Sequence, residues 1–585
     1  MRVSSASSTV PLLLALFFPA YTTGAPDCTG SDPVAADTYD YIIVGSGAAG
    51  IPLADRLSEA GKTVLLIERG PPSSGRWLPE EELRNDHLPF DNWRPDWLKG
   101  TNLTRFDVPG LLQRIWRDSA NITCDDLEDQ IAGCVLGGGM AINSAYWWRP
   151  PDIDWDYNFP DGWKSQDMAP AVSRAFERMP WTDHPSTDGI DYRPEGYNLI
   201  STTLAAAGWK NVTANATPNE KTKTFSRANF FYAGGERAGT LATYLVTASQ
   251  RPNFHLWTNT MARRVTRSGP RITGVEVESR GAGGRCGTVA GRRVVLAGGY
   301  YSTPKLLFRS GIGPRDQLRV VQAAEPDLVD EAQWLALPVG RGLADHTVTD
   351  LQLTHDSIVQ YDFQAAWSDP VPADAARYLA NRTGILTTSA PNMGPIAWDV
   401  VAARQIQYTA RSTGNTTRSM TVSQFLGRGL TSRGAVTIAP DLRMRISTLP
   451  YLRTEEDKEA VVRGLEAVVE ALRAAGDGIR FTAPAEGVSV REYVDSYPVT
   501  SDGRRGLHFM GTAKMGTDSG LEPGGMSVVD IDTRVYGTEN LFVVDASIMP
   551  GMVTGNPSGA IVAVAEKAAE RILASETYLA KEKGL

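Results

Sequence analysis

The 585-residue chain is poor in the residues that build metal centres and disulfide-rich folds, with only four cysteines and six histidines. No two cysteines have C-x-x-C spacing, which argues against a zinc site or a redox-active dithiol, and we predict no metal. The formal net charge of −9 lacks the basic excess that a nucleic-acid partner requires. Beyond the N-terminal region, no uninterrupted apolar run reaches bilayer length, so we expect neither a transmembrane helix nor a membrane partner.

Residues 1–25 have the pattern of a secretory signal peptide. Arg2 gives a positive start, residues 10–20 form a short apolar stretch, and small residues follow at 22–25. The stretch is too short to cross a bilayer as a lone helix. An interfacial anchor is the alternative interpretation. We therefore expect a secreted, extracellular protein.

Two further features agree with export. The cysteines Cys28, Cys124, Cys134 and Cys286 are even in number, which permits two disulfides in an oxidising compartment. Cys124 and Cys134 bracket a short segment, and we predict that they pair. Potential N-glycosylation sequons begin at Asn102, Asn121, Asn211, Asn215, Asn381 and Asn415.

A glycine-rich turn near the N-terminus has the setting of a dinucleotide site. A strand predicted over 41–44 leads into the sequence GSGAAG, a helix predicted over 51–60 follows, and a second strand over 64–67 ends at an acid. The first glycine permits the tight turn, the second lets the backbone approach a pyrophosphate, and the third lets the helix pack on the strand. The helix N-terminus offers N–H groups to phosphates, and the acid can bind ribose hydroxyls. A purely structural turn is the alternative. The predicted nucleotide contacts are Gly45, Gly47, Ala48, Ala49, Gly50 and Glu68.

Strands with similar endings recur far along the chain. One is predicted over 293–297 before Gly298-Gly299, and another over 540–544 before Asp545. A helix is predicted from 553 to 573. Such recurrence favours one α/β domain assembled from distant segments, an arrangement that commonly holds the elongated FAD molecule.

Several segments together resemble the hallmark motifs of the glucose–methanol–choline (GMC) oxidoreductases. Within that family, the stretches at 182–189, 239–245 and 372–381 look like the flavin domain of fungal cellobiose dehydrogenase. The family motifs are matched by Gly45–Gly50, by Cys134–Gly139 (CVLGGG), by Ser310–Pro314 (SGIGP) and by Gly555-Asn556-Pro557.

The resemblance implies an α/β, Rossmann-like FAD-binding domain and an α+β substrate-binding domain with an antiparallel sheet. The first would comprise 37–150, 250–345 and 505–585, and the second 151–249 and 346–504. Some relatives tether FAD through a histidine near the CVLGGG segment. Residues 140–143 (MAIN) contain no histidine, so we expect noncovalent FAD. Further cofactor contacts implied by the resemblance are Gly138, Asn143, Val265, Asp545 and Asn556.

The resemblance also implies a catalytic pair, His508 and Asn556. A neutral imidazole, with an ordinary pKa of about 6.5, suits removal of a hydroxyl proton. Asn556 would hydrogen-bond the same oxygen while flavin N5 takes the hydride. His346 and His184 are read as structural, and Trp147 and Trp148 as core residues rather than sugar-stacking ones. Arg411 is read as a solvated surface residue.

The favoured substrate is a sugar or oligosaccharide, oxidised at its anomeric carbon to a lactone, with electrons passing to a quinone or another small acceptor. Leu507 precedes the catalytic histidine where the cellobiose enzymes look to have a sugar-contacting asparagine. That departure favours the alternative, an alcohol or lactol dehydrogenase or oxidase in a fungal secondary-metabolite pathway. A catalytically inactive flavoprotein that only binds partners is a third hypothesis.

Overall fold

The structure is a computed structural model, and the predicted signal peptide and the sequons at Asn121 and Asn415 lie outside its described residues. It describes residues 28, 32–34, 37–74, 76–78, 92–117, 122–128, 130–390, 393–412, 418–474 and 478–582.

One of the two large sheets is built around parallel strands in the order β8-β3-β2-β11-β20. Val64–Ile67 is buried along its whole length, as expected for a parallel strand covered on both faces. Two further strands, β9 and β10, extend the sheet as an antiparallel meander on the first half of β11. These strands are β2 (Thr38–Val44), β3 (Val64–Ile67), β8 (Phe254–Trp257), β9 (Thr260–Ser268), β10 (Arg271–Ser279), β11 (Arg285–Leu296) and β20 (Leu541–Val543).

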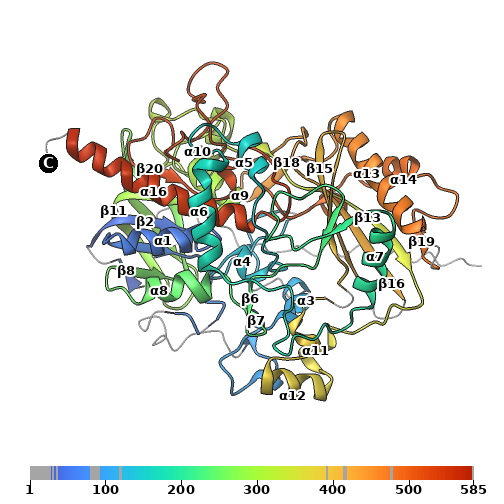
Figure 1. Ribbon diagram of the computed structural model, residues 1–585. Coiled ribbons are helices and arrows are strands. Elements are labelled where there is room, and N and C mark those ends of the chain that lie inside the picture. Colours follow the sequence, from blue (N-terminus) through green and yellow to red (C-terminus); the bar gives the residue numbers. More distant parts are fainter. Residues whose placement is uncertain are drawn as a thin grey trace, which may run out of the picture.

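The other large sheet has the order β19-β13-β16-β15-β14-β5-β4, and all its pairs are antiparallel except β4–β5. Helices α13 and α7 pack against it, and α14 packs on α13 (Figure 1). The elements are β4 (Lys210–Asn211), β5 (Thr224–Ser226), β13 (Thr347–Thr354), β14 (Ile396–Val401), β15 (Arg404–Arg411), β16 (Ser419–Leu426), β19 (Arg480–Ala483), α7 (Glu195–Ala206), α13 (Glu455–Ala474) and α14 (Val490–Ser496).

The two sheets confirm the predicted fold class, with a Rossmann-like domain assembled from distant segments and a second domain carrying an antiparallel sheet. The parallel strands fall within the ranges predicted for the first domain. One helix crosses the predicted boundary: α6 (Ser165–Arg178), assigned to the second domain, packs along α16 (Ser558–Glu582) of the first (Figure 1). An ion pair of 3.1 Å between Arg174 Nε and Glu566 Oε2 joins these two helices.

Among the described helices, none combines the length and hydrophobicity needed to cross a bilayer.

Strand β1 (Asp32–Pro33) pairs with β11 at the margin of the first sheet, and helix α1 (Gly50–Glu59) joins β2 to β3. The other elements are shorter helices and small sheets: α3 (Leu112–Arg117), α4 (Gly139–Ile142), α5 (Asp152–Asn158), β6 (Tyr232–Ala233), β7 (Glu236–Arg237), α8 (Val246–Ser249), α9 (Gly299–Phe308), α10 (Arg315–Ala324), β12 (Arg341–Leu343), α11 (Ala365–Ser368), α12 (Pro372–Asn381), β17 (Gly434–Ile438), β18 (Met444–Thr448) and α15 (Ser501–Arg504).

The cysteines form two disulfides. The predicted pair Cys124–Cys134 is confirmed, and Cys28 pairs with Cys286 on β11.

One sequon prediction needs correction. The side chain of Asn215 is only 7% exposed and hydrogen-bonds the backbone of Trp147 and Arg149, so it has no room for a glycan. By contrast, the described sequon residues Asn102, Asn211 and Asn381 are exposed.

Candidate active site

A cavity of about 770 Å³ opens where the parallel strands end. Its wall includes Gly45 after β2, Glu68 after β3, Gly298 after β11 and Asp545 after β20. The carboxyl ends of parallel strands are the usual ligand site of open α/β sheets. The opposite wall is formed by side chains of β13, β15 and β16, so the cavity lies between the two sheets. Its volume is in the range of cofactor-sized ligand sites.

The glycine-rich turn lines this cavity at Gly45, Gly47, Ala48 and Ala49. A Cβ atom added to Gly47 would meet no atom within 4 Å, so the backbone there faces open space that a ligand can approach closely. Gly50 does not line the cavity. A Cβ there would lie 1.8 Å from the Gly45 carbonyl oxygen, so its role is the close packing of helix and turn.

Glu68 is buried beside the same turn and lines the cavity. Its Oε2 accepts hydrogen bonds from the Ser46 backbone N–H at 3.1 Å and from the Ser46 hydroxyl at 2.5 Å, and its Oε1 accepts from the Gly70 N–H at 2.8 Å. Burial raises the pKa of Glu68, although these donors oppose the shift. The carboxylate is held in place, and its remaining lone pairs can accept hydrogen bonds from ribose hydroxyls.

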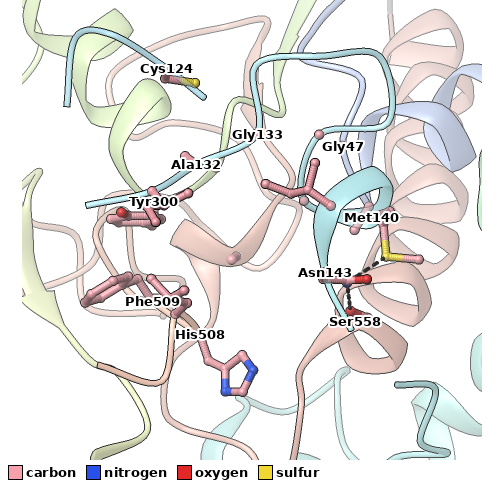
Figure 2. A pocket seen from close by; sticks show the side chains of 18 of the residues that line it. Gly47, Cys124, Ala132, Gly133, Met140, Asn143, Tyr300, His508, Phe509 and Ser558 are labelled. Carbon is pink, nitrogen blue, oxygen red and sulfur yellow. Dashed lines mark hydrogen bonds between the residues drawn. The ribbon is translucent and has the colours of Figure 1, made fainter. Parts of the chain in front are cut away.

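Two other predicted cofactor residues line the cavity with side chains that also bind neighbouring turns. Asp545 Oδ2 accepts from the Gly299 N–H at 2.8 Å and from the Thr303 hydroxyl at 2.6 Å. Asn143 donates to the Ser558 hydroxyl at 3.2 Å, and its Oδ1 accepts from the Ala145 N–H at 2.9 Å (Figure 2). Gly138, on the turn before α4, lines the cavity next to Gly47.

Val265 requires a correction. It is buried in β9, its N–H donates to the Ser310 hydroxyl at 3.0 Å, and it does not line the cavity. The part of β9 that reaches the cavity is 260–263. The cofactor contact predicted at Val265 therefore lies further toward the N-terminal end of the strand.

The predicted catalytic pair comes together in the cavity. His508 follows α15, Asn556 precedes α16, and Asn556 Nδ2 lies 2.9 Å from His508 Nε2. Burial lowers the pKa of His508 to about 4, so the imidazole is neutral near pH 7. Figure 2 shows His508 on the same wall of the cavity as Tyr300 and Phe509. The rings of Tyr300 and Phe509 stack with their centroids 4.7 Å apart.

His346, expected to be structural, lies directly behind His508. Its Nδ1 is 3.2 Å from His508 Nδ1, and its Nε2 is 3.0 Å from the Val553 carbonyl oxygen. A carbonyl can only accept, so His346 Nε2 carries the hydrogen, and Nδ1 of this neutral ring accepts one from His508 Nδ1. Burial lowers the pKa of His346 well below its usual value, which keeps it neutral. The bonding partners therefore assign the Nδ1–H tautomer to His508, with the Nε2 lone pair toward the cavity.

Asp345 holds the backbone that carries His508. Its carboxylate accepts from the N–H groups of Gly506 and His508, both at 2.8 Å, and from the Tyr451 hydroxyl at 3.0 Å. Burial raises the pKa of Asp345 to about 7, against the effect of these donors. Between the two bound N–H groups, Leu507 has φ of +58°, a left-handed conformation uncommon for leucine.

Neither Trp147 nor Trp148 lines the cavity. Trp147 is fully buried and stacks on Phe176 at 4.6 Å, so it is a core residue as expected. Trp148 is also buried, but its indole Nε1 donates to Asn556 Oδ1 at 3.0 Å. Arg411 is exposed, as expected, and it also lines the cavity. Among the described residues, no group of three or more His, Cys, Asp or Glu side chains could hold a metal ion.

Comparisons with known proteins agree with this architecture. Two GMC oxidoreductase family models match the chain, one over residues 39–348 and the other over 431–565. Curated relatives include the oxygen-dependent choline dehydrogenases of Pseudomonas putida, 28% identical with 91% of this chain and 94% of that protein covered, and of Serratia proteamaculans, 29% identical with 91% and 95% covered. Among solved structures, pyridoxine 4-oxidase from Mesorbium loti is 22% identical with a TM-score of 0.66, covering 92% and 99% of the two chains. A formate oxidase is 19% identical with a TM-score of 0.71, covering 93% and 99%.

The expected special likeness to cellobiose dehydrogenase needs correction, because bacterial choline dehydrogenases match the chain over nearly its full length. The structural likenesses, all below 25% identity, support the fold alone. The two family models cover more than half of the chain, including the glycine-rich turn, His508 and Asn556. The chain therefore belongs to the GMC oxidoreductase family, and its cofactor is FAD.

Proposed function

We propose that the protein oxidises the CH–OH group of an alcohol-type substrate whose hydroxyl contacts both His508 Nε2 and Asn556 Nδ2. The observation that carries this proposal is the 2.9 Å distance between these two atoms at the cavity wall, where Nε2 is an acceptor and Nδ2 a donor. A substrate hydroxyl that approaches from the cavity and replaces their direct hydrogen bond would donate to Nε2 and accept from Nδ2. The choline dehydrogenases among the relatives agree with this class of substrate.

The cavity fits the cofactor. The open space at Gly47 suits the close approach of a pyrophosphate, and Glu68 and the N-terminal end of α1 suit the adenosine ribose and phosphates. When bound, FAD supplies the chemistry of accepting a hydride from the substrate carbon. Among the described residues that line the cavity, His508 is the one histidine, and both cysteines are in a disulfide, which supports noncovalent attachment.

The work of the protein is to take the hydroxyl proton and to stabilise the oxygen. The His508 Nε2 lone pair accepts the proton, since its Nδ1 is already protonated and bonded to His346. Asn556 Nδ2 donates to the oxygen as negative charge grows on it, an interaction that is stronger in the transition state than in the ground state. Base assistance of this kind contributes about 10²–10⁴-fold.

Two substrate classes stay as proposals, a sugar or oligosaccharide oxidised at the anomeric carbon to a lactone, and an alcohol or lactol of a fungal secondary-metabolite pathway. The residues around His508 favour the second. Leu507 and Val348 line the cavity, and the Phe425 ring lies 5.9 Å from the imidazole. These apolar groups next to His508 offer no hydrogen bond to a sugar hydroxyl, although polar side chains such as Asp350 and Arg411 also line the cavity.

Export is also proposed. Two disulfides and the exposed residues Asn102, Asn211 and Asn381 support a secreted, N-glycosylated protein. For the electron acceptor we propose a quinone or another small molecule. Oxygen is the alternative, because the choline dehydrogenases among the relatives are named oxygen-dependent.

The test is anaerobic mixing of the purified yellow protein with candidate substrates while flavin absorbance is followed. We expect bleaching by at least one apolar or aryl alcohol. Bleaching by cellobiose or xylo-oligosaccharides alone would select the sugar proposal. No bleaching by any alcohol or sugar would contradict the proposed function and favour a binding role.

A further inference from the structure

We propose that Trp148 and Gln407 are positioning residues that fix the side-chain amide of Asn556 in the one orientation that serves the reaction. The inference rests on the proposed function, because it concerns how the base and its partner are presented to the substrate. A carboxamide has two nearly isosteric orientations, one presenting N–H groups and the other a carbonyl oxygen. Two donors on the far side of Asn556 decide between them.

The choice is set by the hydrogen bond from Trp148, which can run in one direction only, and the Gln407 amide adds a second donor. Trp148 Nε1 lies 3.0 Å from Asn556 Oδ1, and an indole N–H can donate but never accept. Gln407 Nε2 donates to the same oxygen at 2.9 Å. Both lone pairs of Oδ1 are thus occupied, and Nδ2 must face His508. A flipped amide would set its NH₂ group against the indole N–H, with two donors facing each other.

Both donors are buried among packed side chains. Trp148 stacks on Tyr146 with centroids 5.7 Å apart and meets the edge of Trp398 at 5.2 Å. Gln407 is only 1% exposed within β15. A Cβ added to Gly555 would lie 2.5 Å from Gln407 Oε1, so the glycine before Asn556 is what allows the strand to come this close.

The orientation matters for both halves of the proton transfer. With Nδ2 forward, Asn556 donates to the substrate oxygen as it becomes negative, and its N–H also favours an unprotonated Nε2 on His508. With Oδ1 forward, the amide would compete for the substrate proton. It would also stabilise the imidazolium, whose Nε2–H could donate to it, and so disable the base. The pH at which the base is lost is therefore sensitive to the flip.

The test compares the FAD-loaded variants Trp148→Phe, Gln407→Met and their combination with the wild type. Phenylalanine and methionine keep most of the apolar volume and remove the donors. Trp163→Phe is the matched control, since Trp163 is fully buried, donates to the Ile531 carbonyl oxygen at 2.8 Å and does not line the cavity. Each single variant should slow flavin reduction several-fold, because the other donor stays. The double variant should lose about 10²–10³-fold, the cost of losing an oxyanion donor.

Two readouts separate positioning from general damage. The midpoint of the pH–rate profile should move upward in the double variant, whereas a merely structural defect lowers the rate equally at every pH. Since the chain has six histidines, selective ¹⁵N-histidine labelling allows His508 to be followed directly, with His508→Ala identifying its signals. We expect unprotonated Nε2 at neutral pH in the wild type and a larger protonated fraction in the double variant.

An unchanged pH midpoint together with unchanged protonation of His508 Nε2 in the double variant would overturn the inference. If the double variant does not fold, the same two readouts on Gln407→Met decide, with a smaller upward shift expected. If no substrate reduces even the wild type, the proposed function fails. The labelled histidine then still reports whether the two donors fix Asn556.

Discussion

The two walls of the cavity are built in different ways. On the cofactor side, one short stretch provides the turn at Gly45–Gly50 and the acid Glu68, joined by hydrogen bonds spanning 22 residues. On the catalytic side, Asn556 meets His508 over 48 residues and Trp148 over 408. Cofactor binding is therefore largely a property of a local motif, while catalytic alignment depends on contacts between segments far apart in the chain. Changes on one side should separate flavin retention from flavin reduction.

The sharpest separation is expected from His508→Ala. The variant keeps the whole cofactor wall, so FAD content should stay at the wild-type level, while the rate of flavin reduction falls by about 10²–10⁴-fold through loss of the base. Stopped-flow absorbance measures the rate, and His184→Ala, at an exposed loop position, is the control. Reduction at the wild-type rate in His508→Ala would refute the assignment of the base.

The converse change is Gly47→Leu. The protein itself leaves room for a Cβ there, so the fold should survive, but the side chain enters the space proposed for the pyrophosphate. We expect FAD affinity to fall at least ~10-fold, equivalent to about 1.4 kcal/mol. Flavin titration and thermal unfolding of the apoprotein measure the two properties. Ala60→Leu, at the exposed end of α1, is the control, and equal FAD affinity in both variants would contradict the proposed site.

The local wall is also the part of the molecule that could be predicted from the sequence. The turn, the helix predicted over 51–60 and the strand over 64–67 match α1 and β3 within a residue, because hydrophobic period and glycine spacing act over short distances. Predictions failed where tertiary contacts decide. The terminal helix was predicted from 553 but begins at Ser558, since the residues before it run past the active site and include Asn556.

The missed members of the site are all partners across long separations. His346, Trp148 and Gln407 follow ordinary buried patterns in their own segments, and no local signal marks a histidine that will touch another histidine. Val265 was placed at the cofactor although only 260–263 of the same strand reaches the cavity. A strand can be predicted from its sequence, whereas the part of it that meets a ligand depends on the whole fold.

The pH dependence of reduction tests the catalytic wall without mutation. Burial lowers the pKa of His508 to about 4, and only the neutral imidazole can accept a proton. The rate constant should be flat from about pH 5.5 to neutrality and fall about tenfold per pH unit once the pH is well below the midpoint. Stopped-flow reduction across this range measures it, with FAD content checked at each pH. A midpoint near 6.5 would mean that the imidazole is not buried as described.

The smallest expected effect concerns Leu507, the residue whose side chain lines the cavity beside His508. Leu507→Asn places a residue that tolerates φ of +58° well and adds a polar group, at the cost of some apolar packing. These terms oppose each other, so the free energy of unfolding should change by no more than about 1 kcal/mol. One new hydrogen bond to a sugar hydroxyl is worth about 0.5–1.5 kcal/mol. The ratio of kcat/KM for cellobiose to that for an aryl alcohol should therefore rise about 2- to 10-fold, while FAD content stays constant. A ratio that falls or does not move would show that the wall around Leu507 does not select the substrate.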